Sequence, residues 1–183
     1  MKIISRQEAY KMSCPSIVRL ATPNDATELW RLTLQANKEN ALRTLAPERI
    51  NWMMNRALYP ELIPLGDMGP RGVIGVIGQE GALEGLVFLL IGQFWYSNEK
   101  HLEELIVFVD PMHRRSHHAK AMIRWMKQQV DYTGLPLLTG VLSRENVDRK
   151  LALYKRLLGD PIGAFFFVTP KGTSLPLAVA ASS

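Results

Sequence analysis

The spacing of apolar residues along the chain predicts four helices. In four separate segments, apolar residues recur every three or four positions, which is typical of helices that bury one face. These residues are Ala26, Leu29, Trp30 and Leu34; Ile50, Met53, Met54 and Ala57; Ala119, Met122, Ile123, Met126 and Val130; and Leu151, Tyr154, Leu157 and Leu158. Thr22-Pro23-Asn24-Asp25 and Pro47 are start signals for the first two helices, and Gly134 and Gly159 are stop signals for the last two.

Short apolar runs rich in β-branched residues predict strands at residues 17–21, 73–77, 83–95, 102–109, 137–142 and 162–169. Turn residues at 78–81 and 97–98 separate the second, third and fourth runs, so these three are expected to form an antiparallel meander. Strand, helix and strand between residues 102 and 142 form a βαβ unit, which turns the sheet parallel at that point.

The predicted order β-α-α-β-β-β-α-β-α-β indicates an α/β fold with a mixed, mostly antiparallel sheet of about six strands flanked by about four helices. With 183 residues and 47% apolar content, the chain is long enough for one domain with its own core. We expect a single domain over residues 1–183, with a core at about 16–170, an N-terminal extension at 1–15 and a loose tail at 171–183.

The cysteine content and the absence of targeting signals favour a cytoplasmic protein. Cys14 is the only cysteine, which excludes an intramolecular disulfide and a thiolate-rich metal site. No apolar run reaches the roughly 18 residues of a membrane span, and the first residues lack the apolar segment of a secretory signal. We therefore expect no membrane partner.

Positive charge exceeds negative charge, with 22 Lys and Arg against 17 Asp and Glu, a net charge of +5 and a pI of about 9.5. This balance favours an anionic partner, either a nucleic acid or a phosphorylated small molecule, although solubility alone also accounts for it. Arg114, Arg115 and Lys120 crowd the predicted start of a helix, where partial positive charge disfavours cations. They predict a bound anion at that helix end.

The same segment carries a motif. Val109-Asp110-Pro111-Met112-His113-Arg114 fits V-x-P-x-x-R, and with the order of elements it resembles the GNAT superfamily of acyl-CoA-dependent N-acyltransferases over about residues 17–169. In that family a loop Q/R-x-x-G-x-G/A follows, whose backbone N–H groups wrap the pyrophosphate of coenzyme A. Arg114 and Ala119 match the outer positions of the loop, whereas His117 stands at its first glycine. The resemblance implies acetyl-CoA as co-substrate.

The resemblance also implies which residues bind coenzyme A: Phe108, Val109, Arg114, Arg115, Ser116, His117, His118, Ala119, Lys120 and Asn146. Val109 is nearest to the backbone N–H that stabilises the oxyanion in the family. The basic side chains at 115, 120 and 124 either contact phosphates or form a solvated face. A side chain at His117 limits how closely a phosphate approaches the backbone, although a helical histidine still offers its N–H.

Acyl transfer to an amine needs a base for the amine and an acid for the thiolate. By resemblance the base is a carboxylate on the fourth strand, where Glu103 and Glu104 are the candidates. They point to opposite faces of a regular strand, and Glu103 is favoured because it shares the parity of Val109. Tyr154 is the family-like general acid, with Asn146 before it. The alternatives are that the two glutamates are solvated and that Tyr154 is a packing residue.

Four histidines, His101, His113, His117 and His118, lie within 18 positions. His113 and His117 are four apart, a spacing that suits two metal ligands on one helical face. Pro111 places His113 before the helix, and no acidic residue or cysteine adjoins the pair. We therefore expect phosphate-side or surface histidines and no metal.

Together these observations predict an N-acetyltransferase that moves an acetyl group from acetyl-CoA to a primary amine, on a small molecule or a macromolecule, in a ternary complex. The resemblance places the acceptor against the first two helices and nearby strand ends, which contribute Trp30, Glu39, Asn40, Trp52, Asn55, Tyr59, Phe94, Trp95 and Tyr96. These aromatic residues are alternatively core. Acetylation of a nucleic acid or aminoacyl-tRNA, a catalytically silent CoA-binding or regulatory protein, and a homodimeric assembly all remain open.

Overall fold

The computed structural model describes residues 17–40, 44–64, 67, 69–143, 146–164 and 166. The strands in this part of the chain are β1 (Arg19–Leu20), β2 (Arg71–Gln79), β3 (Ala82–Gln93), β4 (Lys100–Val109) and β5 (Leu137–Leu138). The α-helices are α2 (Ala26–Asn40), α3 (Pro47–Leu58), α4 (His118–Thr133) and α5 (Val147–Leu158). Short 3-10 turns lie at Pro23–Asp25, Pro60–Leu62 and Pro111–His113. The predicted order of helices and strands is therefore confirmed through α5.

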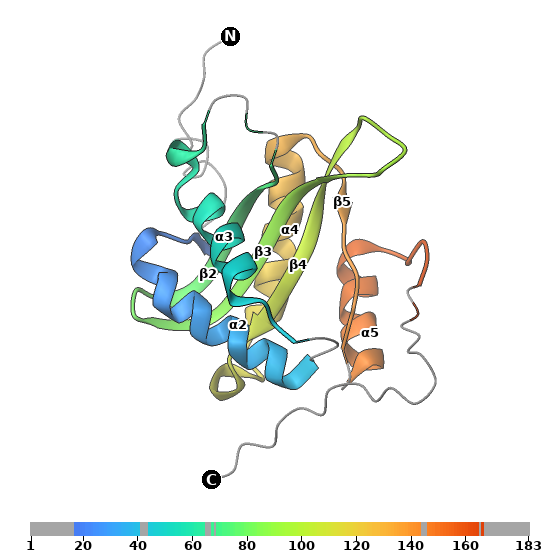
Figure 1. Ribbon diagram of the computed structural model, residues 1–183. Coiled ribbons are helices and arrows are strands. Elements are labelled where there is room, and N and C mark those ends of the chain that lie inside the picture. Colours follow the sequence, from blue (N-terminus) through green and yellow to red (C-terminus); the bar gives the residue numbers. More distant parts are fainter. Residues whose placement is uncertain are drawn as a thin grey trace, which may run out of the picture.

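The strands form one sheet in the order β1-β2-β3-β4-β5. Neighbouring strands from β1 to β4 are antiparallel, and β5 is parallel to β4. In Figure 1, α2 and α3 cover one face of the sheet, α4 covers the other, and α5 lies beside β5. The α/β class, the antiparallel meander and the parallel βαβ unit are all confirmed.

Each face of the sheet has its own apolar core. Under α2 and α3 the core includes Leu29, Leu32, Met54, Leu86 and Phe88, and under α4 and α5 it includes Val87, Leu89, Met122, Trp125 and Met126. The fully buried ring of Trp125 packs against Gly75 of β2, where an added Cβ would lie 3.0 Å from the ring. The sheet therefore needs a residue without a side chain at the point where the largest core residue packs.

The predicted start of the first helix is confirmed by a buried carboxylate. Asp25 is fully buried and accepts hydrogen bonds from the Thr22 N–H at 2.8 Å and from the Arg19 guanidinium at 2.7 and 2.8 Å. Burial by itself raises the pKa of Asp25, but the bonds from Arg19 and Thr22 outweigh it and leave that pKa below its ordinary value. This group ties β1 to the first turn before α2.

Three strands differ from the sequence prediction. The strand predicted at 17–21 contains only Arg19 and Leu20. The strand predicted at 137–142 contains only Leu137 and Leu138, because β5 pairs with β4 over no other residues. In the segment predicted as the last strand, residues 162–164 and 166 are not in a strand, and Ile162 is 99% exposed. Residues 165 and 167–169 lie outside the described residues, as do the predicted extension at 1–15 and tail at 171–183. The described sheet thus has five strands where about six were predicted.

Every helix within the described ranges is too short or too polar to cross a lipid bilayer.

Candidate active site

The site begins where β4 and β5 diverge. The two strands pair only at Leu102 with Leu137 and at Glu103 with Leu138, and the Leu102 N–H donates to the Pro136 carbonyl at 2.7 Å. β4 then continues to Val109 without a strand partner on the β5 side among the described residues. Backbone groups of β4 over residues 104–109 are therefore not used by the sheet on this side.

Glu104 is the first residue of β4 beyond that last pair. Its carboxylate accepts hydrogen bonds from the Tyr154 hydroxyl, at 3.2 Å to Oε1 and 3.0 Å to Oε2, and from the Thr139 hydroxyl. Tyr154 comes from α5, and Thr139 directly follows β5. Three segments thus bring a carboxylate and two hydroxyl groups together at the point of divergence.

The environment raises the pKa of both titratable groups of this cluster, Glu104 and Tyr154. Burial raises the pKa of Glu104 to about 7, although the hydrogen bonds from Thr139 and Tyr154 oppose the shift. Burial also raises the pKa of Tyr154 well above its ordinary value, and the adjacent negative charge of Glu104 adds to the effect. Near neutral pH, Glu104 therefore gains and loses a proton readily while Tyr154 keeps its own. These are the protonation states of a general base and a general acid.

Glu103 and Glu104 lie on opposite faces of the sheet, but their faces are the reverse of those expected. Phe88 of β3 pairs with Ile106, whereas the next residue, Leu89, pairs with Glu104. Leu105 is thus an extra residue, a β-bulge that interrupts the alternation of side chains. The prediction that Glu103 shares the face of Val109 is therefore wrong.

The bulge determines which residue of β3 lies opposite each glutamate, and therefore on which face of the sheet each glutamate lies. Glu104 lies opposite Leu89, a core residue under α4 and α5. Val109 packs against the same core, so Glu104 and Val109 share this face of the sheet. Glu103 pairs with Leu90 and lies on the α2 and α3 face, as Phe88 does. The fold therefore brings Glu104, and not Glu103, to Tyr154.

Aromatic residues predicted to line the acceptor site gather near Glu103. An added Cβ at Gly92 would lie 3.1 Å from Glu103 Oε2 and 3.1 Å from His101 Nε2, so these two side chains converge over Gly92. The Phe94 ring stacks on His101 with centroids 4.4 Å apart, and Tyr96 stacks on Phe94 at 5.3 Å. Trp95 is 95% exposed at the same turn. This turn leaves apolar surface open beside a carboxylate.

The other residues predicted for the acceptor site are dispersed. Trp30 and Tyr59 pack against the core under α2 and α3, which is the alternative the sequence left open. Trp52 and Asn55 are exposed on α3, where the Arg56 guanidinium lies 5.0 Å from the Trp52 ring centroid. The side chain of Asn40 lies outside the described residues.

The predicted phosphate loop connects β4 to α4. His117 occupies the N-cap position of α4 with φ −88° and ψ 9°, outside the left-handed region that favours glycine, so the backbone there does not require the family's glycine. The left-handed conformation falls instead on Arg115, with φ 74°. The His118 N–H donates to Ser116 Oγ at 3.2 Å, and the N–H groups of Ala119 and Lys120 have no acceptor among the described residues. The helix start therefore offers free donors.

The side chain of Arg114 is engaged elsewhere. It forms an ion pair with Glu39 of α2, and its guanidinium lies 5.6 Å from the ring centroid of Phe108. Phe108 is itself buried in the core under α2 and α3. Asn146, at the start of α5, is left-handed with φ 53°, and its carbonyl accepts from the Lys150 N–H at 3.0 Å. These residues shape the loop and the helix start, while Arg115 is exposed.

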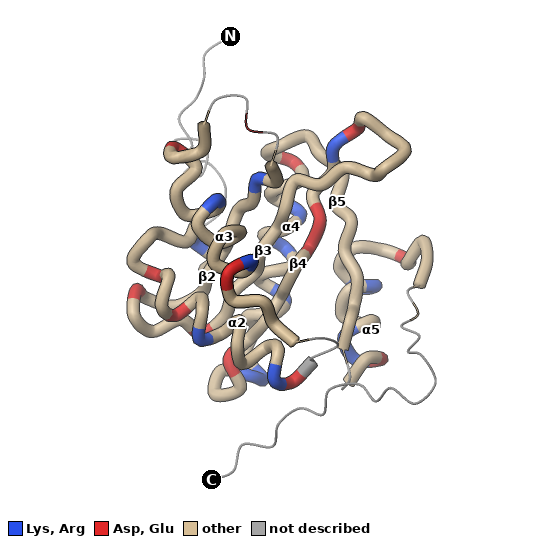
Figure 2. The backbone as a smooth tube through the Cα atoms, viewed as in Figure 1, with Lys and Arg blue, Asp and Glu red and all other residues tan. Residues whose placement is uncertain are grey.

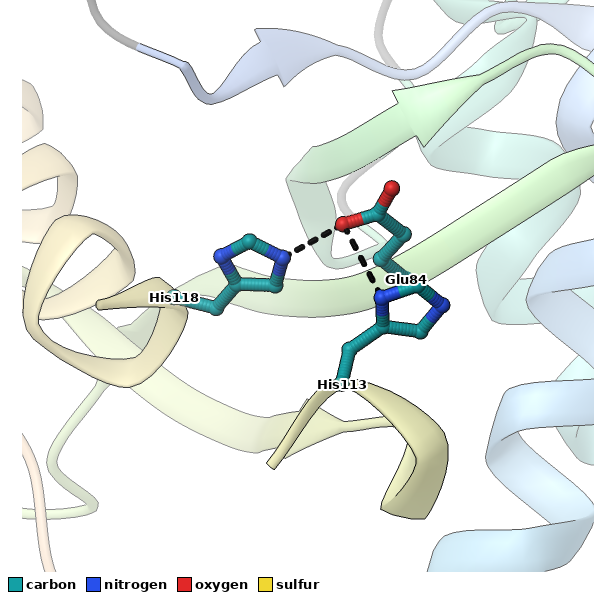
Figure 3. Close-up of side chains that lie close together, drawn as sticks. All are labelled: Glu84, His113 and His118. Carbon is teal, nitrogen blue, oxygen red and sulfur yellow. Dashed lines mark hydrogen bonds and ion pairs between the residues drawn. The ribbon is translucent and has the colours of Figure 1, made fainter. Parts of the chain in front are cut away.

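Two histidines at the ends of the loop meet an acidic residue that sequence reasoning missed. Glu84 of β3 accepts from His118 at 2.5 Å and lies 3.4 Å from His113 (Figure 3). The spacing of His113 and His117 raised a metal site in the sequence, where no acidic residue adjoins them, but the structure brings His113 together with His118 and Glu84. Glu84 is far away in the sequence, and no local signal marks it.

Arg31 and Thr139 were also missed. Arg31 of α2 pairs with Asp110 at 2.7 Å and donates to the Leu83 carbonyl at 2.9 Å, so it fixes the start of the loop to α2 and β3. Both residues act through partners distant in the sequence, which hydrophobic periodicity and motif spacing do not detect.

No protein-family model and no curated protein sequence matches the chain. Solved structures do match it. An integron cassette protein, HFX_CASS3, from the mobile metagenome of Cole Harbour Salt Marsh has a TM-score of 0.61 at 19% identity, over 91% of this chain and 97% of that one. A ribosomal-protein-alanine N-acetyltransferase from Brucella melitensis biovar Abortus 2308 has a TM-score of 0.57 at 15% identity, over 83% of this chain and 96% of that one.

A third match is AAC(6')-Iy in complex with the bisubstrate analogue CoA-S-monomethyl-acetylneamine, with a TM-score of 0.57 at 14% identity, over 84% of this chain and 97% of that one. The chain therefore has the fold of the GNAT acetyltransferases over most of its length, as the sequence resemblance predicted. At this level of identity the likeness concerns the fold, and function has to be argued from the site.

Proposed function

We propose that the protein is an N-acetyltransferase that moves an acetyl group from acetyl-CoA to a primary amine by direct transfer in a ternary complex. The observation that carries this proposal is the hydrogen-bonded pair of Glu104 and Tyr154 at the divergence of β4 and β5, on the strand face of Val109. A CoA-containing bisubstrate analogue bound to a protein of the same fold supports direct transfer.

Residues 114–120 are the proposed site for the pyrophosphate of coenzyme A. The free N–H groups of Ala119 and Lys120 lie at the positive end of α4, and Arg115 and Lys120 add cationic side chains. The backbone of His117 needs no glycine, so its side chain does not by itself exclude the phosphate. We assign the acyl-carrying arm to the unpaired edge of β4 between Val109 and Glu104, where backbone groups pair with an extended ligand as an added strand does.

The pair then moves one proton from nitrogen to sulfur. The amine nitrogen attacks the thioester carbonyl and forms the C–N bond, while a backbone N–H near Val109 stabilises the oxyanion. The amine proton passes to Glu104 directly or through water, and the C–S bond breaks as Tyr154 protonates the departing thiolate. Glu104 returns a proton to Tyr154 across their 3.0 Å hydrogen bond. The pKa of Glu104 near 7 suits it to both halves of this transfer.

Glu103 has a different proposed role. It lies on the opposite face of β4, beside the exposed aromatic turn at residues 94–96. A carboxylate beside aromatic rings suits an amine that arrives as a cation, by charge and by cation–π contact. We therefore assign Glu103 to binding the acceptor and Glu104 to proton transfer.

The test combines calorimetry with acetyl-CoA and turnover measured over a panel of primary amines. Tyr154→Phe and Glu104→Gln should lower kcat about 100-fold with acetyl-CoA affinity nearly unchanged, because both side chains act in the chemical step. Glu103→Gln is the matched control on the other face and should mainly raise KM for the amine. No acetyl-CoA binding at high micromolar concentration would contradict both this function and a silent CoA-binding protein. Binding without turnover of any amine would favour the silent protein.

An amine on a nucleic acid remains the alternative acceptor. The net charge of +5 favours it, and α4 carries Lys120, Arg124 and Lys127 at helical spacing with no acidic residue before Asp131. Along α2 and α3, the helices expected to border the acceptor, basic residues are interleaved with acidic ones (Figure 2). We therefore place an amine on a small molecule or a protein first. Binding to RNA that weakens steeply as salt concentration rises would reverse this order.

A further inference from the structure

Glu84, His113 and His118 form a cluster of three metal-ligating side chains outside the proposed catalytic pair (Figure 3). Glu84 comes from β3, His113 from the turn Pro111–His113, and His118 is the first residue of α4. Both imidazole rings are directed at the same oxygen, with His118 Nε2 at 2.5 Å and His113 Nδ1 at 3.4 Å from Glu84 Oε2. One ligand atom from each residue lies within 4.8 Å of the others.

One of these separations matches that between ligand atoms on a tetrahedral ion, and a second is shorter. With metal–ligand distances of about 2.0 to 2.2 Å, ligand atoms on a tetrahedral Zn²⁺ are about 3.4 Å apart. His113 Nδ1 and Glu84 Oε2 already have that separation. The contact of His118 with Glu84 must widen by about 0.9 Å, which a small rotation of the partly exposed Glu84 side chain provides.

The charges around the cluster leave Glu84 available to a cation. The neighbouring carboxylates of Asp110 and Glu28 are both paired with Arg31, at 2.7 and 2.9 Å. Glu84 has no Lys or Arg partner among the described residues, and its carboxylate faces the two imidazoles alone. Two imidazoles and a carboxylate are the donor set of many zinc sites.

We propose that Glu84, His113 and His118 bind Zn²⁺, with His113 Nδ1, His118 Nε2 and the Glu84 carboxylate as ligands and a fourth position left for water or another oxygen ligand. The site does not depend on the proposed acetyltransferase function. Its ligands stand at both ends of the loop 114–117, so the bound ion holds this loop between β3 and α4.

The environment of the His118 ring limits the expected affinity for Zn²⁺. His118 Nδ1 is buried and has no hydrogen-bond partner among the described residues. Coordination through Nε2 puts the ring proton on Nδ1, and ligating histidines that lack an acceptor for that proton bind metal about 10- to 100-fold more weakly. We therefore expect micromolar affinity for Zn²⁺, weaker than that of a structural zinc site.

The experiment uses the full chain, freed of metal and of any purification tag. Calorimetry with zinc chloride should show one site, and Co²⁺ should give the intense visible absorption of a tetrahedral complex. Glu84→Gln, His113→Gln and His118→Gln should each weaken binding at least about 10-fold. His117→Gln and His101→Gln are the matched controls and should bind as the wild type does. Circular dichroism of each metal-free variant checks that it is folded.

Absence of Zn²⁺ binding up to high micromolar concentration would overturn the proposal and leave the cluster as a hydrogen-bonded contact. So would binding that survives Glu84→Gln and His113→Gln, or that is lost equally in His117→Gln. His113 is the more exposed of the two ligating histidines. Its variant therefore keeps the test decisive if His118→Gln does not fold.

Discussion

Replacing Glu104 by glutamine tests the electrostatics of the site through protein stability, independently of any substrate. The pKa of this carboxyl group is 4.5 ordinarily and about 7 in the folded protein. Between these values the folded state holds a proton that the unfolded state has released, so this contribution to stability is complete below pH 4.5 and is lost as the pH rises through 7. Glutamine cannot ionise, and its carbonyl still accepts the Tyr154 hydroxyl.

The magnitude follows from linkage. At about 1.36 kcal/mol per pH unit, the wild type loses up to about 2.5 kcal/mol from this group between about pH 5 and pH 8.5. Solvent contact of the partly buried side chain lowers this figure, so about 1.5 to 2.5 kcal/mol is expected. Urea unfolding of wild type and Glu104→Gln at both pH values measures it. All other titrating groups are common to the two proteins and cancel in the difference.

Glu103→Gln is the matched control and should follow the wild-type pH profile. Parallel stability profiles for wild type and Glu104→Gln, within about 0.5 kcal/mol, would refute the reasoning. Glu104 would then titrate near its ordinary value and would not be held protonated by burial.

Further predictions concern the rate, the core and the loop. The kcat/KM of the wild type should rise through an apparent pKa of about 7, and Glu104→Gln should lose that limb of the profile. Asp25→Ala should cost about 3 kcal/mol in urea unfolding, since it removes the buried carboxylate that accepts from the Arg19 guanidinium and the Thr22 N–H. Trp125→Ala should cost about 3 to 5 kcal/mol in the same assay, as a fully buried ring is removed. His117→Gly should change acetyl-CoA affinity less than about threefold by calorimetry, because the backbone at this position does not need glycine.

Sequence periodicity was sufficient for the helices and for most of the sheet. α2, α3 and α4 each bury one stripe, so Leu29, Met54, Met122 and Met126 are in the core as their spacing predicted. The stripe of α5 is only partly buried, and Leu151 is exposed. The parallel contact of β4 and β5 followed from the helix between them. The length of β5 could not be predicted from the sequence, because its apolar run continues past the point where the chain separates from β4. The pattern of apolar residues does not show where a strand loses its hydrogen-bonded neighbour.

The candidate site was predicted less completely. Tyr154 and the two glutamates were identified by resemblance, but strand parity assigned the glutamates to the wrong faces, because a bulge at Leu105 changes the count without changing the residue types. Thr139, Glu84 and Arg31 were missed because each acts on a residue from another part of the chain. Contacts of this kind depend on the assembled fold.

The bulge also has a consequence for sequence comparison. In a regular strand the residue on the face of Val109 at the level of Glu104 would be four positions before Val109, and here it is five, because Leu105 has no cross-strand partner. An ungapped alignment with a relative that has a regular β4 would therefore match the relative's carboxylate to Leu105. The correct alignment places a one-residue gap inside the strand, where gaps are usually penalised. Searches for proteins that share the pair of Glu104 and Tyr154 should allow a one-residue gap between the positions of Glu104 and Val109.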